Sequence, residues 1–282
     1  MSAYILYNPK SGNGSGFEEA QILEVFQLDD CVITDVTKIM DYPNFLSKIT
    51  ADDTVILCGG DGTLNRFVND TDGYCIPCDV LYYPIGTGND FAHDLGYHSG
   101  ANPFSIKQYI QDLPSVTVNN KKCRFLNGIG YGIDGYCCEE GDRQKAAGKK
   151  KVNYTGIAIK GLLSKYKPKN ATVCVNGKKY SYKNVWIAAT MKGRYYGGGM
   201  MTAPAQDRLN PKGEVTLVVM HGSGKFKTLR VFPSIFKGEH IKHAEMCAVH
   251  TGRHISVTFD EPASLQIDGE TVLNVTKYSV EA

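Results

Sequence analysis

The sequence predicts an α/β protein: an N-terminal domain built on a parallel sheet, followed by a mainly antiparallel β domain. Over about the first 115 residues, short apolar runs alternate with amphipathic stretches, as in βαβ units. Beyond that point one strand pattern follows another, with the hairpin signal Asn176-Gly177 between two of them. We therefore expect domains 1–115 and 116–282 with an active-site cleft between them. The final strand could return to the first domain.

The first domain is expected to contain four buried strands, because four short apolar runs are separated by polar or helical segments. The segment Phe17–Phe26 has apolar residues at helical spacing and is expected to form a covering helix. The predicted strands are Tyr4–Tyr7, Cys31–Val36, Thr54–Cys58 and Val80–Tyr83.

The second domain is expected to contain at least six strands and two helices. The helices lie near Tyr154–Tyr166 and Phe226–Phe236. The predicted strands are Val116–Val118, Thr172–Val175, Val185–Thr190, Glu214–Met220, His254–Phe259 and Leu265–Ile267.

The composition is that of an ordinary globular protein, with 42% hydrophobic and 21% charged residues. A net charge of +2 gives no electrostatic basis for binding nucleic acid. The nine cysteines are irregularly spaced, which favours a reducing compartment, and packing is the preferred role for Cys75 and Cys78. No apolar run approaches the ~20 residues of a membrane span. We expect a cytoplasmic protein. The sequence contains no feature that indicates its oligomeric state.

Three glycine-rich segments follow predicted strands of the first domain. Glycine lets backbone N–H groups converge on phosphate oxygens, and a helix that starts there adds its positive end. The alternative is that these are tight turns and helix caps. Three such loops at the strand ends of one sheet favour phosphate binding, although neither a Walker P-loop nor a GxGxxG pattern is present. The segments are Asn8–Gly14, Gly59–Asn65 and Pro84–Asp90.

In these motifs the chain resembles the diacylglycerol kinase catalytic family, which includes sphingosine and ceramide kinases. The matching segments run in family order along nearly the whole chain. The element Gly-Gly-Asp-Gly-Thr by itself also occurs in NAD kinases and phosphofructokinases. The segments Tyr196–Met200 and Asp268–Glu270 favour the lipid kinases. The matches are Asn8–Gly12, Gly59–Asn65, Pro84–Ala92, Asn127–Gly132, Tyr196–Met200 and Asp268–Glu270.

The resemblance implies a nucleotide site and a catalytic pair. Glu270 matches the general base, and Asp268 the neighbouring carboxylate, which could also contact the Mg²⁺ that arrives with ATP. Asp61 and Asp90 match acidic positions near the magnesium and the phosphates. Further nucleotide contacts are implied at Thr37 and Thr87. The phosphate-binding positions are Asn8, Pro9, Lys10, Ser11, Gly12, Gly59, Gly60, Asp61, Gly62, Thr63, Leu64 and Asn65.

Two positions depart from the family pattern. Arg66 replaces a glutamate common in bacterial members, on the helix beyond the phosphates. Lys212 stands where bacterial members commonly carry an aspartate that helps hold a structural magnesium. An ammonium group accepts no hydrogen bond and binds no cation, so we expect no magnesium there, and the ammonium itself could satisfy nearby carbonyl groups. Glu214 is the possible replacement carboxylate.

A basic segment from Arg143 to Lys169 contains nine lysines or arginines and no acidic residue. Lys149, Lys150 and Lys151 precede its helical part. The segment could contact anionic lipid headgroups, or it could be a solvated helix face with a lysine-rich loop.

The sequence thus predicts a kinase that uses ATP and Mg²⁺ and phosphorylates a hydroxyl group of a lipid such as diacylglycerol. Two alternatives stay open. One is an NAD kinase, which shares the Gly-Gly-Asp-Gly-Thr element. The other is a catalytically weak member of the same fold that binds nucleotide or lipid. The lipid itself is not identified by any motif.

Overall fold

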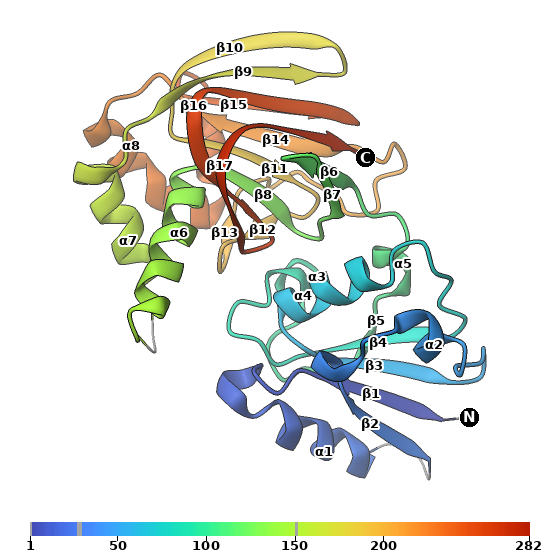
Figure 1. The fold of residues 1–282 in the computed structure, drawn as a ribbon. Helices are drawn as coiled ribbons and strands as arrows, with labels where there is room; N and C mark the ends of the chain where they lie inside the picture. The colour runs from blue at the N-terminus through green and yellow to red at the C-terminus, as the bar shows by residue number, and fades with distance from the viewer. Residues whose placement is uncertain (1, 27–29, 150–151) are drawn as a thin grey trace. The chain divides into compact units, whose positions relative to one another are not determined.

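The computed structural model describes residues 2–26, 30–149 and 152–282. The chain forms two compact units, Met1–Leu113 and Pro114–Ala282, each with its own sheet (Figure 1).

The first unit is built on a five-stranded sheet in the order β2-β1-β3-β4-β5. The first four strands are parallel, and β5 is antiparallel to β4. All four predicted strands are present. The strands are β1 (Ala3–Tyr7), β2 (Cys31–Asp35), β3 (Thr54–Gly59), β4 (Asp79–Pro84) and β5 (Phe104–Ser105).

Helices cover this sheet. On one side, Ala20 and Leu23 of α1 pack against Ile5 and Ile56 of the central strands. Figure 1 shows α3 and α4 on the opposite side. The helices are η1 (Gly12–Gly14), α1 (Gly16–Phe26), η2 (Val36–Lys38), α2 (Tyr42–Leu46), α3 (Asp61–Asp70), α4 (Asp90–Asp94) and α5 (Lys107–Ile110).

The parallel arrangement brings the glycine-rich loops to one edge of the sheet. Tyr7 lies opposite Cys58, and Gly59 lies opposite Pro84, so β1, β3 and β4 end nearly level with one another. Their carboxyl ends are where open α/β sheets bind ligands.

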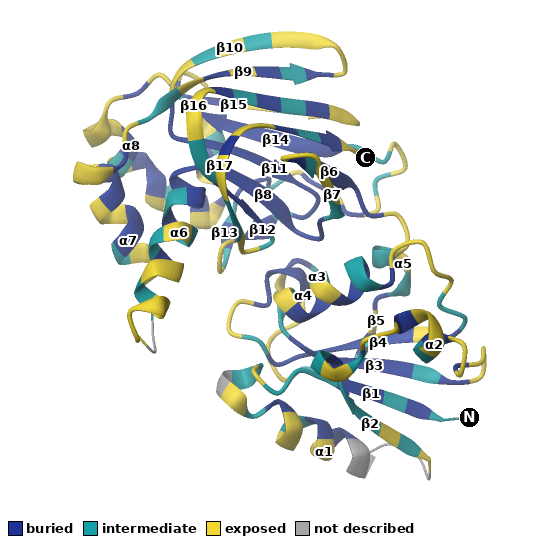
Figure 2. Ribbon diagram, in the orientation of Figure 1, coloured by how far each residue is buried: buried dark blue, intermediate teal, exposed yellow. Residues whose placement is uncertain are grey.

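The second unit contains a ten-stranded antiparallel sheet in the order β15-β14-β11-β8-β16-β17-β6-β7, to which β9 and β10 add along β16. The long strand β16 pairs with β8, β9 and β17. Figure 2 shows β8, β11 and β14 almost wholly buried. The strands are β6 (Ser115–Val118), β7 (Lys121–Arg124), β8 (Gly128–Gly132), β9 (Lys169–Val175), β10 (Lys178–Val185), β11 (Ile187–Met191), β14 (Val215–Met220), β15 (Cys247–Gly252), β16 (His254–Ile267) and β17 (Glu270–Glu281).

Helices also pack on this sheet, where a core cluster joins Ile157 and Leu162 to Trp186 and Val218. A short separate hairpin, β12 (Tyr195–Tyr196) with β13 (Met200–Met201), flanks the three glycines 197–199. The helices are α6 (Ile133–Ala146), α7 (Tyr154–Lys160), the π-helical turn η3 (Gly161–Lys165), α8 (Lys225–Val231), η4 (Phe232–Lys237) and η5 (Glu239–Lys242).

Three features differ from the sequence-based expectation. The last strand, β17, pairs with β16 and β6 of its own unit and does not return to the first. The two strands predicted within 254–267 are one continuous strand. The single strand predicted at Val185–Thr190 is divided between β10 and β11.

All nine cysteines are free thiols. Cys78 is buried, which agrees with a packing role, whereas Cys75 is exposed, so the packing role predicted for Cys75 is wrong. Lys150 and Lys151 of the predicted basic segment lie outside the described residues. Within the described ranges, no helix is long and apolar enough to cross a membrane.

Candidate functional site

The first loop is fixed to the second by the side chain of Asn8. Its Oδ1 accepts the N–H of Lys10 (3.0 Å), which closes a turn after β1. Its Nδ2 donates to the Thr63 hydroxyl oxygen (2.9 Å), and the Ser11 hydroxyl lies 3.3 Å from that oxygen. Pro9 is half-buried and Lys10 is exposed. Thr63 therefore links the two loops.

The second loop leads directly from β3 into α3. Gly60 stands at the N-cap and has no side chain with which to cap the positive end of the helix. A Cβ atom added at Gly62 would meet no atom within 4 Å, so the space beside this residue is open. Leu64 is fully buried, and its N–H donates to the Gly60 carbonyl (3.1 Å). Leu64 thus belongs to the core, and the predicted contact with ATP gains no support from its side chain.

The third loop packs against the second through backbone atoms. A Cβ atom added at Gly86 would lie 2.5 Å from the Cα atom of Gly60, so neither position has room for a side chain. Both carboxylate oxygens of Asp61 accept backbone N–H groups, from Asp90 (2.8 Å) and Phe91 (2.9 Å). Asp61 therefore caps the start of α4 and holds this loop in place, while Asp90 is buried.

A cavity of about 310 Å³ brings the first and third loops together in the first unit. Its wall includes the predicted residues Gly12 and Thr87, the latter exposed. Glu19 belongs to the wall and accepts a hydrogen bond from the Tyr83 hydroxyl (3.0 Å). Four further wall residues were not indicated by the sequence motifs, because they lie outside the three glycine-rich segments. These are Ser15, Glu19, Ser99 and Gly100.

Thr37 lies after β2, one strand further along the same edge. Its N–H and its hydroxyl both donate to Asp35 Oδ1, at 2.9 and 2.7 Å. These bonds form the cap of η2. Thr37 is not among the residues that line the cavity.

In the second unit, Glu270 stands beside a tight turn between β16 and β17. Asp268 and Gly269 occupy the turn with φ of 46° and 93°, the positive values of a type I′ hairpin. The Gly269 N–H donates to Gln266 Oε1 (2.8 Å), and the Thr271 hydroxyl donates to Asp142 Oδ2 (2.6 Å). Glu270 is exposed, whereas the residues on both sides of it are anchored.

The carboxylate of the half-buried Asp268 accepts the N–H groups of three consecutive residues, Leu126, Asn127 (2.8 Å) and Gly128 (2.9 Å). The buried Arg208 binds the same loop. Its guanidinium donates to the Leu126 carbonyl (2.6 Å) and to Asn127 Oδ1 (2.5 Å). Asp268 thus fixes the turn that carries Glu270.

A buried acid that the motifs did not single out lies in the first turn of α6. Asp134 is 6% exposed, and its Oδ2 has no hydrogen-bond partner among the described residues. Burial raises its pKa to about 7. The only sequence signal was its place after Asn127–Gly132.

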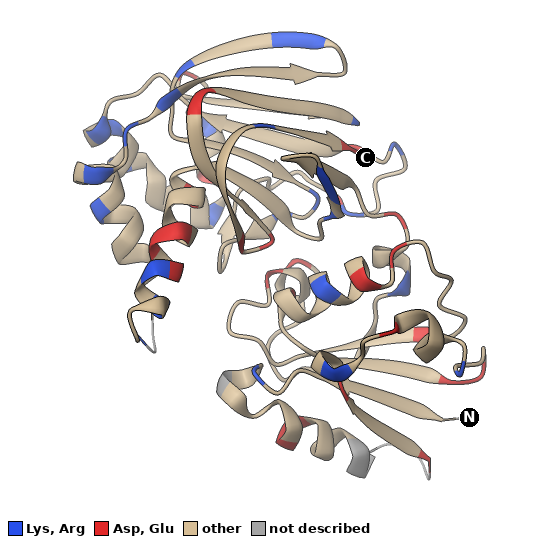
Figure 3. Cartoon of the chain, viewed as in Figure 1, with Lys and Arg blue, Asp and Glu red and all other residues tan. Residues whose placement is uncertain are grey.

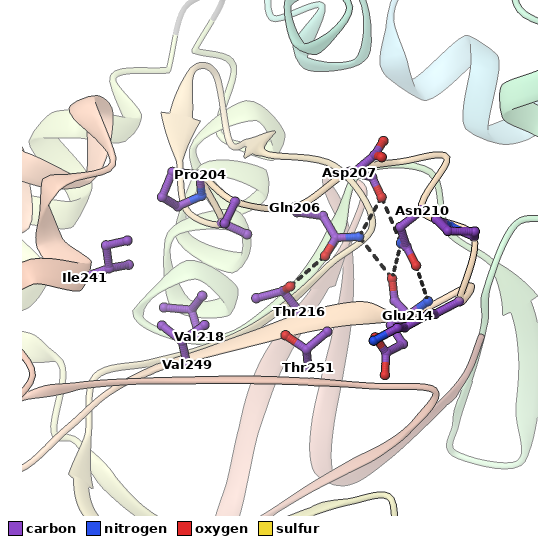
Figure 4. Close-up of a pocket in the computed structure, with 14 residues that line it drawn as sticks. Pro204, Gln206, Asp207, Asn210, Glu214, Thr216, Val218, Ile241, Val249 and Thr251 are labelled. Carbon is purple, nitrogen blue, oxygen red and sulfur yellow. Dashed lines mark hydrogen bonds between the residues drawn. The ribbon is translucent and has the colours of Figure 1, made fainter.

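The loop 206–214, which contains Lys212 and in which we expect no magnesium, borders a cavity of about 300 Å³ (Figure 4). Here Gln206 Nε2 donates to the carbonyls of Asp207 (3.1 Å) and Glu214 (3.0 Å). Asn210 Nδ2 donates to the same two carbonyls, and its Oδ1 accepts the Glu214 N–H. Two side-chain amides therefore satisfy carbonyls that could bind a cation. The exposed Lys212 does not take this role, contrary to our expectation.

Among the described residues, no group of three or more His, Cys, Asp or Glu side chains could hold a metal ion. The absence of a structural magnesium around Lys212 stays a prediction.

Comparison with known families matches both units. Residues 2–117 match the diacylglycerol kinase catalytic domain, and residues 127–279 match the YegS C-terminal NAD kinase beta sandwich-like domain. The chain belongs to the diacylglycerol kinase catalytic family. The predicted resemblance and the predicted fold class are thereby confirmed.

Two relatives illustrate how similar the chain is to known proteins. A diacylglycerol kinase from Mycobacterium tuberculosis is 27% identical over 227 residues, which cover 77% of this chain and 70% of that protein. The crystal structure of a diacylglycerol kinase from Bacillus anthracis str. Sterne superposes with a TM-score of 0.64 at 18% identity. The superposition covers 99% of this chain and 92% of that one.

Proposed function

We propose that this family member is a lipid kinase that transfers the γ-phosphoryl group of Mg-ATP to a hydroxyl group of a lipid alcohol such as diacylglycerol. The observation that carries the proposal is the joining of three glycine-rich loops at one sheet edge. Thr63 joins the first loop to the second, and Gly60 and Gly86 join the second to the third. A turn or cap would need none of these connections.

The first unit supplies the nucleotide site in this proposal. The glycine at the N-cap of α3 and the open space beside Gly62 suit phosphate oxygens. The exposed Lys10 adds a positive charge. The polar wall of the cavity, with Ser15 and Thr87, suits other parts of the nucleotide. Thr63 acts as a positioning residue, because its hydroxyl already accepts from Asn8.

Magnesium is proposed to arrive with ATP and to be bound mainly by phosphate oxygens. When bound, it would neutralise charge on the phosphates. Both oxygens of Asp268 accept backbone N–H groups, so we assign Asp268 a positioning role instead of metal binding.

Glu270 is proposed as the general base. The oxygen of the acceptor hydroxyl forms a bond to the γ-phosphorus as the bond between that phosphorus and the β,γ-bridging oxygen breaks. ADP leaves, and the hydroxyl proton passes to the Glu270 carboxylate. Exposure of Glu270 next to an anchored turn suits this role, because the carboxylate is accessible while its backbone is fixed.

The test is incubation of the purified protein with γ-labelled ATP, magnesium and a panel of acceptors, followed by chromatography. The panel contains diacylglycerol, a sphingoid base, phosphatidylglycerol and NAD. We expect labelled phosphate in the lipid extract. Label in NADP would instead identify an NAD kinase, and nucleotide binding without any labelled product would identify a catalytically weak member.

A further inference from the structure

The cavity of about 310 Å³ in the first unit adjoins the proposed phosphate position. Gly12, which belongs to the first loop, is part of its wall, and so is Gly86, which lies against Gly60 at the N-cap of α3. The cavity volume is at the lower end of the range for small-molecule sites. A nucleotide with its phosphates at the start of α3 can therefore reach this cavity with its nucleoside part.

The polar side-chain atoms of the cavity wall are mainly hydrogen-bond acceptors. The Ser15 hydroxyl donates to the Gly12 carbonyl (2.9 Å), and the Ser99 hydroxyl donates to the Pro84 carbonyl (3.3 Å). Each of these hydroxyl oxygens is left with lone pairs only. Glu19 adds a carboxylate, which also accepts hydrogen bonds and donates none. The wall thus favours a ligand group that donates hydrogen bonds, unlike a phosphate group, which accepts them.

The Glu19 side chain is fixed between α1 and β4. The Tyr83 hydroxyl donates to Glu19 Oε2 (3.0 Å), and the next residue, Ala20, is fully buried against the sheet. Burial and this hydrogen bond raise the pKa of Tyr83 to about 12, so the phenol stays a donor at neutral pH. The other oxygen, Oε1, accepts no hydrogen bond from any described residue. It is therefore available to a ligand.

The charges at the starts of α1 and α3 distinguish the two ends of a nucleotide. Figure 3 shows acidic but no basic residues on α1, whose first turn contains Glu18 and Glu19. These carboxylates repel a phosphate group. The one acid in the first turn of α3, Asp61, is occupied by the N–H groups of Asp90 and Phe91. Phosphate is thus favoured at α3, and an uncharged donor group at α1.

We infer that the Glu19 carboxylate binds a hydroxyl group of the nucleotide's ribose and so selects ribonucleotides over deoxyribonucleotides. The ribose diol offers two donors to a wall of acceptors. An acidic side chain plays the same part in dinucleotide-binding α/β sheets. Ser15 and Ser99 supply further acceptors for the second hydroxyl group. Glu19 lies outside the motifs that carry the family resemblance.

The inference rests on the proposed function, because it places the nucleotide of a kinase in the cavity, but the two can fail separately. A protein that labels a lipid from ATP and binds deoxy-ATP as tightly as ATP would lack the ribose contact and still be a lipid kinase. A protein that prefers ribonucleotides but transfers no phosphoryl group would keep the contact and lose the kinase assignment. A protein that binds no nucleoside triphosphate would refute both.

The first experiment measures the affinity of the full chain for ATP, 2′-deoxy-ATP and 3′-deoxy-ATP by calorimetry. We expect at least one deoxynucleotide to bind about tenfold more weakly than ATP, because a hydrogen bond to a charged group is lost. Glu19→Ala should weaken ATP binding about tenfold and leave binding of that deoxynucleotide unchanged, since the contact is already missing. Equal affinities in the wild type, or a preference that survives in Glu19→Ala, would overturn the inference.

Two further variants control this measurement. Glu18→Ala removes an exposed carboxylate of the same helix turn that lies outside the cavity wall, so it should retain both the ATP affinity and the preference. Glu19→Gln keeps the size of the side chain and a weaker acceptor, so it should lose part of the preference. Losses in Glu18→Ala equal to those in Glu19→Ala would reduce the effect to general charge and overturn the contact.

The second experiment separates the ribose from the base. Inosine triphosphate has the same ribose as ATP but lacks the amino group of adenine, which is the other donor that a carboxylate could bind. Glu19→Ala should therefore weaken binding of inosine triphosphate by the same factor as binding of ATP. If the substitution weakens ATP binding alone, Glu19 binds the base, and the inference is wrong.

Discussion

Asp61 and Asp268 are aspartates whose carboxylates hold loops by accepting N–H groups. Asp61 fastens the third glycine-rich loop to the second, and Asp268 fastens the hairpin of Glu270 to residues 126–128. A hydrogen bond to a charged group contributes about 1.5–3 kcal/mol. Loss of either carboxylate would therefore disturb a loop geometry before it altered any chemical step.

Glu270→Gln tests the general base. The substitution keeps the size of the side chain but removes its ability to accept a proton, so turnover should fall roughly 10²–10⁴-fold. Affinity for ATP, measured by calorimetry, should stay unchanged. Glu261→Gln is the control, since Glu261 is an exposed glutamate of the neighbouring strand. Wild-type turnover in Glu270→Gln would remove this residue from the mechanism.

Gly62→Ala separates stability from binding. A methyl group at Gly62 meets no atom within 4 Å, and alanine favours a helix, so the free energy of unfolding should stay unchanged or rise by about 0.5 kcal/mol. The same methyl group would occupy the space proposed for phosphate, so ATP affinity should fall at least about tenfold. Urea unfolding and calorimetry measure the two quantities. Unchanged affinity would mean that phosphate does not approach Gly62.

Asp134 should give the stability a pH dependence. Its pKa is raised from 3.8 to about 7, so the folded state holds this proton more tightly than the unfolded state does. The free energy of unfolding is therefore highest below about pH 4, as far as this group is concerned. It falls as pH rises from about 4 to about 7, by up to ~1.4 kcal/mol per pH unit. Urea unfolding should show that Asp134→Asn removes this slope. Parallel pH profiles for the two proteins would contradict the raised pKa.

The residue types at the candidate site could be predicted from sequence, but the residues that they pack against or hydrogen-bond to could not. Gly60 and Gly86 were expected to lie near phosphate, and the close approach of their backbones gives a second reason for glycine at both positions. Leu64 belongs to a motif yet faces the core. Asp134 escaped notice because its burial depends on how α6 packs against β16, which no local pattern encodes.

At the scale of elements, the loop 206–214 should be independent of metal. The amides of Gln206 and Asn210 already bind the carbonyls of Asp207 and Glu214. Adding EDTA or magnesium should therefore leave the melting temperature of the nucleotide-free protein unchanged. Asn210→Ala should lower the free energy of unfolding by about 1–3 kcal/mol, because it leaves backbone groups without partners. An increase in melting temperature with magnesium alone would reveal a metal site.

Two of the elements that the sequence did not predict, β8 and α6, contain several glycines. Strand β8 was recognised only as a motif, because Gly128, Gly130 and Gly132 weaken the strand pattern. Helix α6 has glycine in its interior, and a Cβ atom at Gly135 would lie 1.8 Å from the Ser264 carbonyl oxygen. These glycines permit close packing of α6 on β16. Long-range packing of this kind overrides local propensity.

At the scale of the whole molecule, the fold class was predictable because the two parts of the chain have different patterns. Strands alternate with helices in the first part, whereas strands follow one another in most of the second. In our proposal the first unit binds the nucleotide and the second supplies the general base. ATP should slow amide hydrogen exchange in the first unit, in the loops 8–12, 59–65 and 86–90. Gly62→Ala should reduce that protection, since it blocks the proposed phosphate position. Protection confined to the second unit would place the nucleotide elsewhere.

The single tryptophan has a practical consequence. Trp186 is buried in the second unit and is hydrogen-bonded immediately before α8, and the first unit contains no tryptophan. Intrinsic fluorescence excited at the indole band is therefore a label-free reporter of one half of the molecule. A denaturation curve followed by tryptophan emission records only the loss of the β-rich half. Far-ultraviolet circular dichroism records both halves, so the difference between the two curves isolates the unfolding of the half that contains the glycine-rich loops.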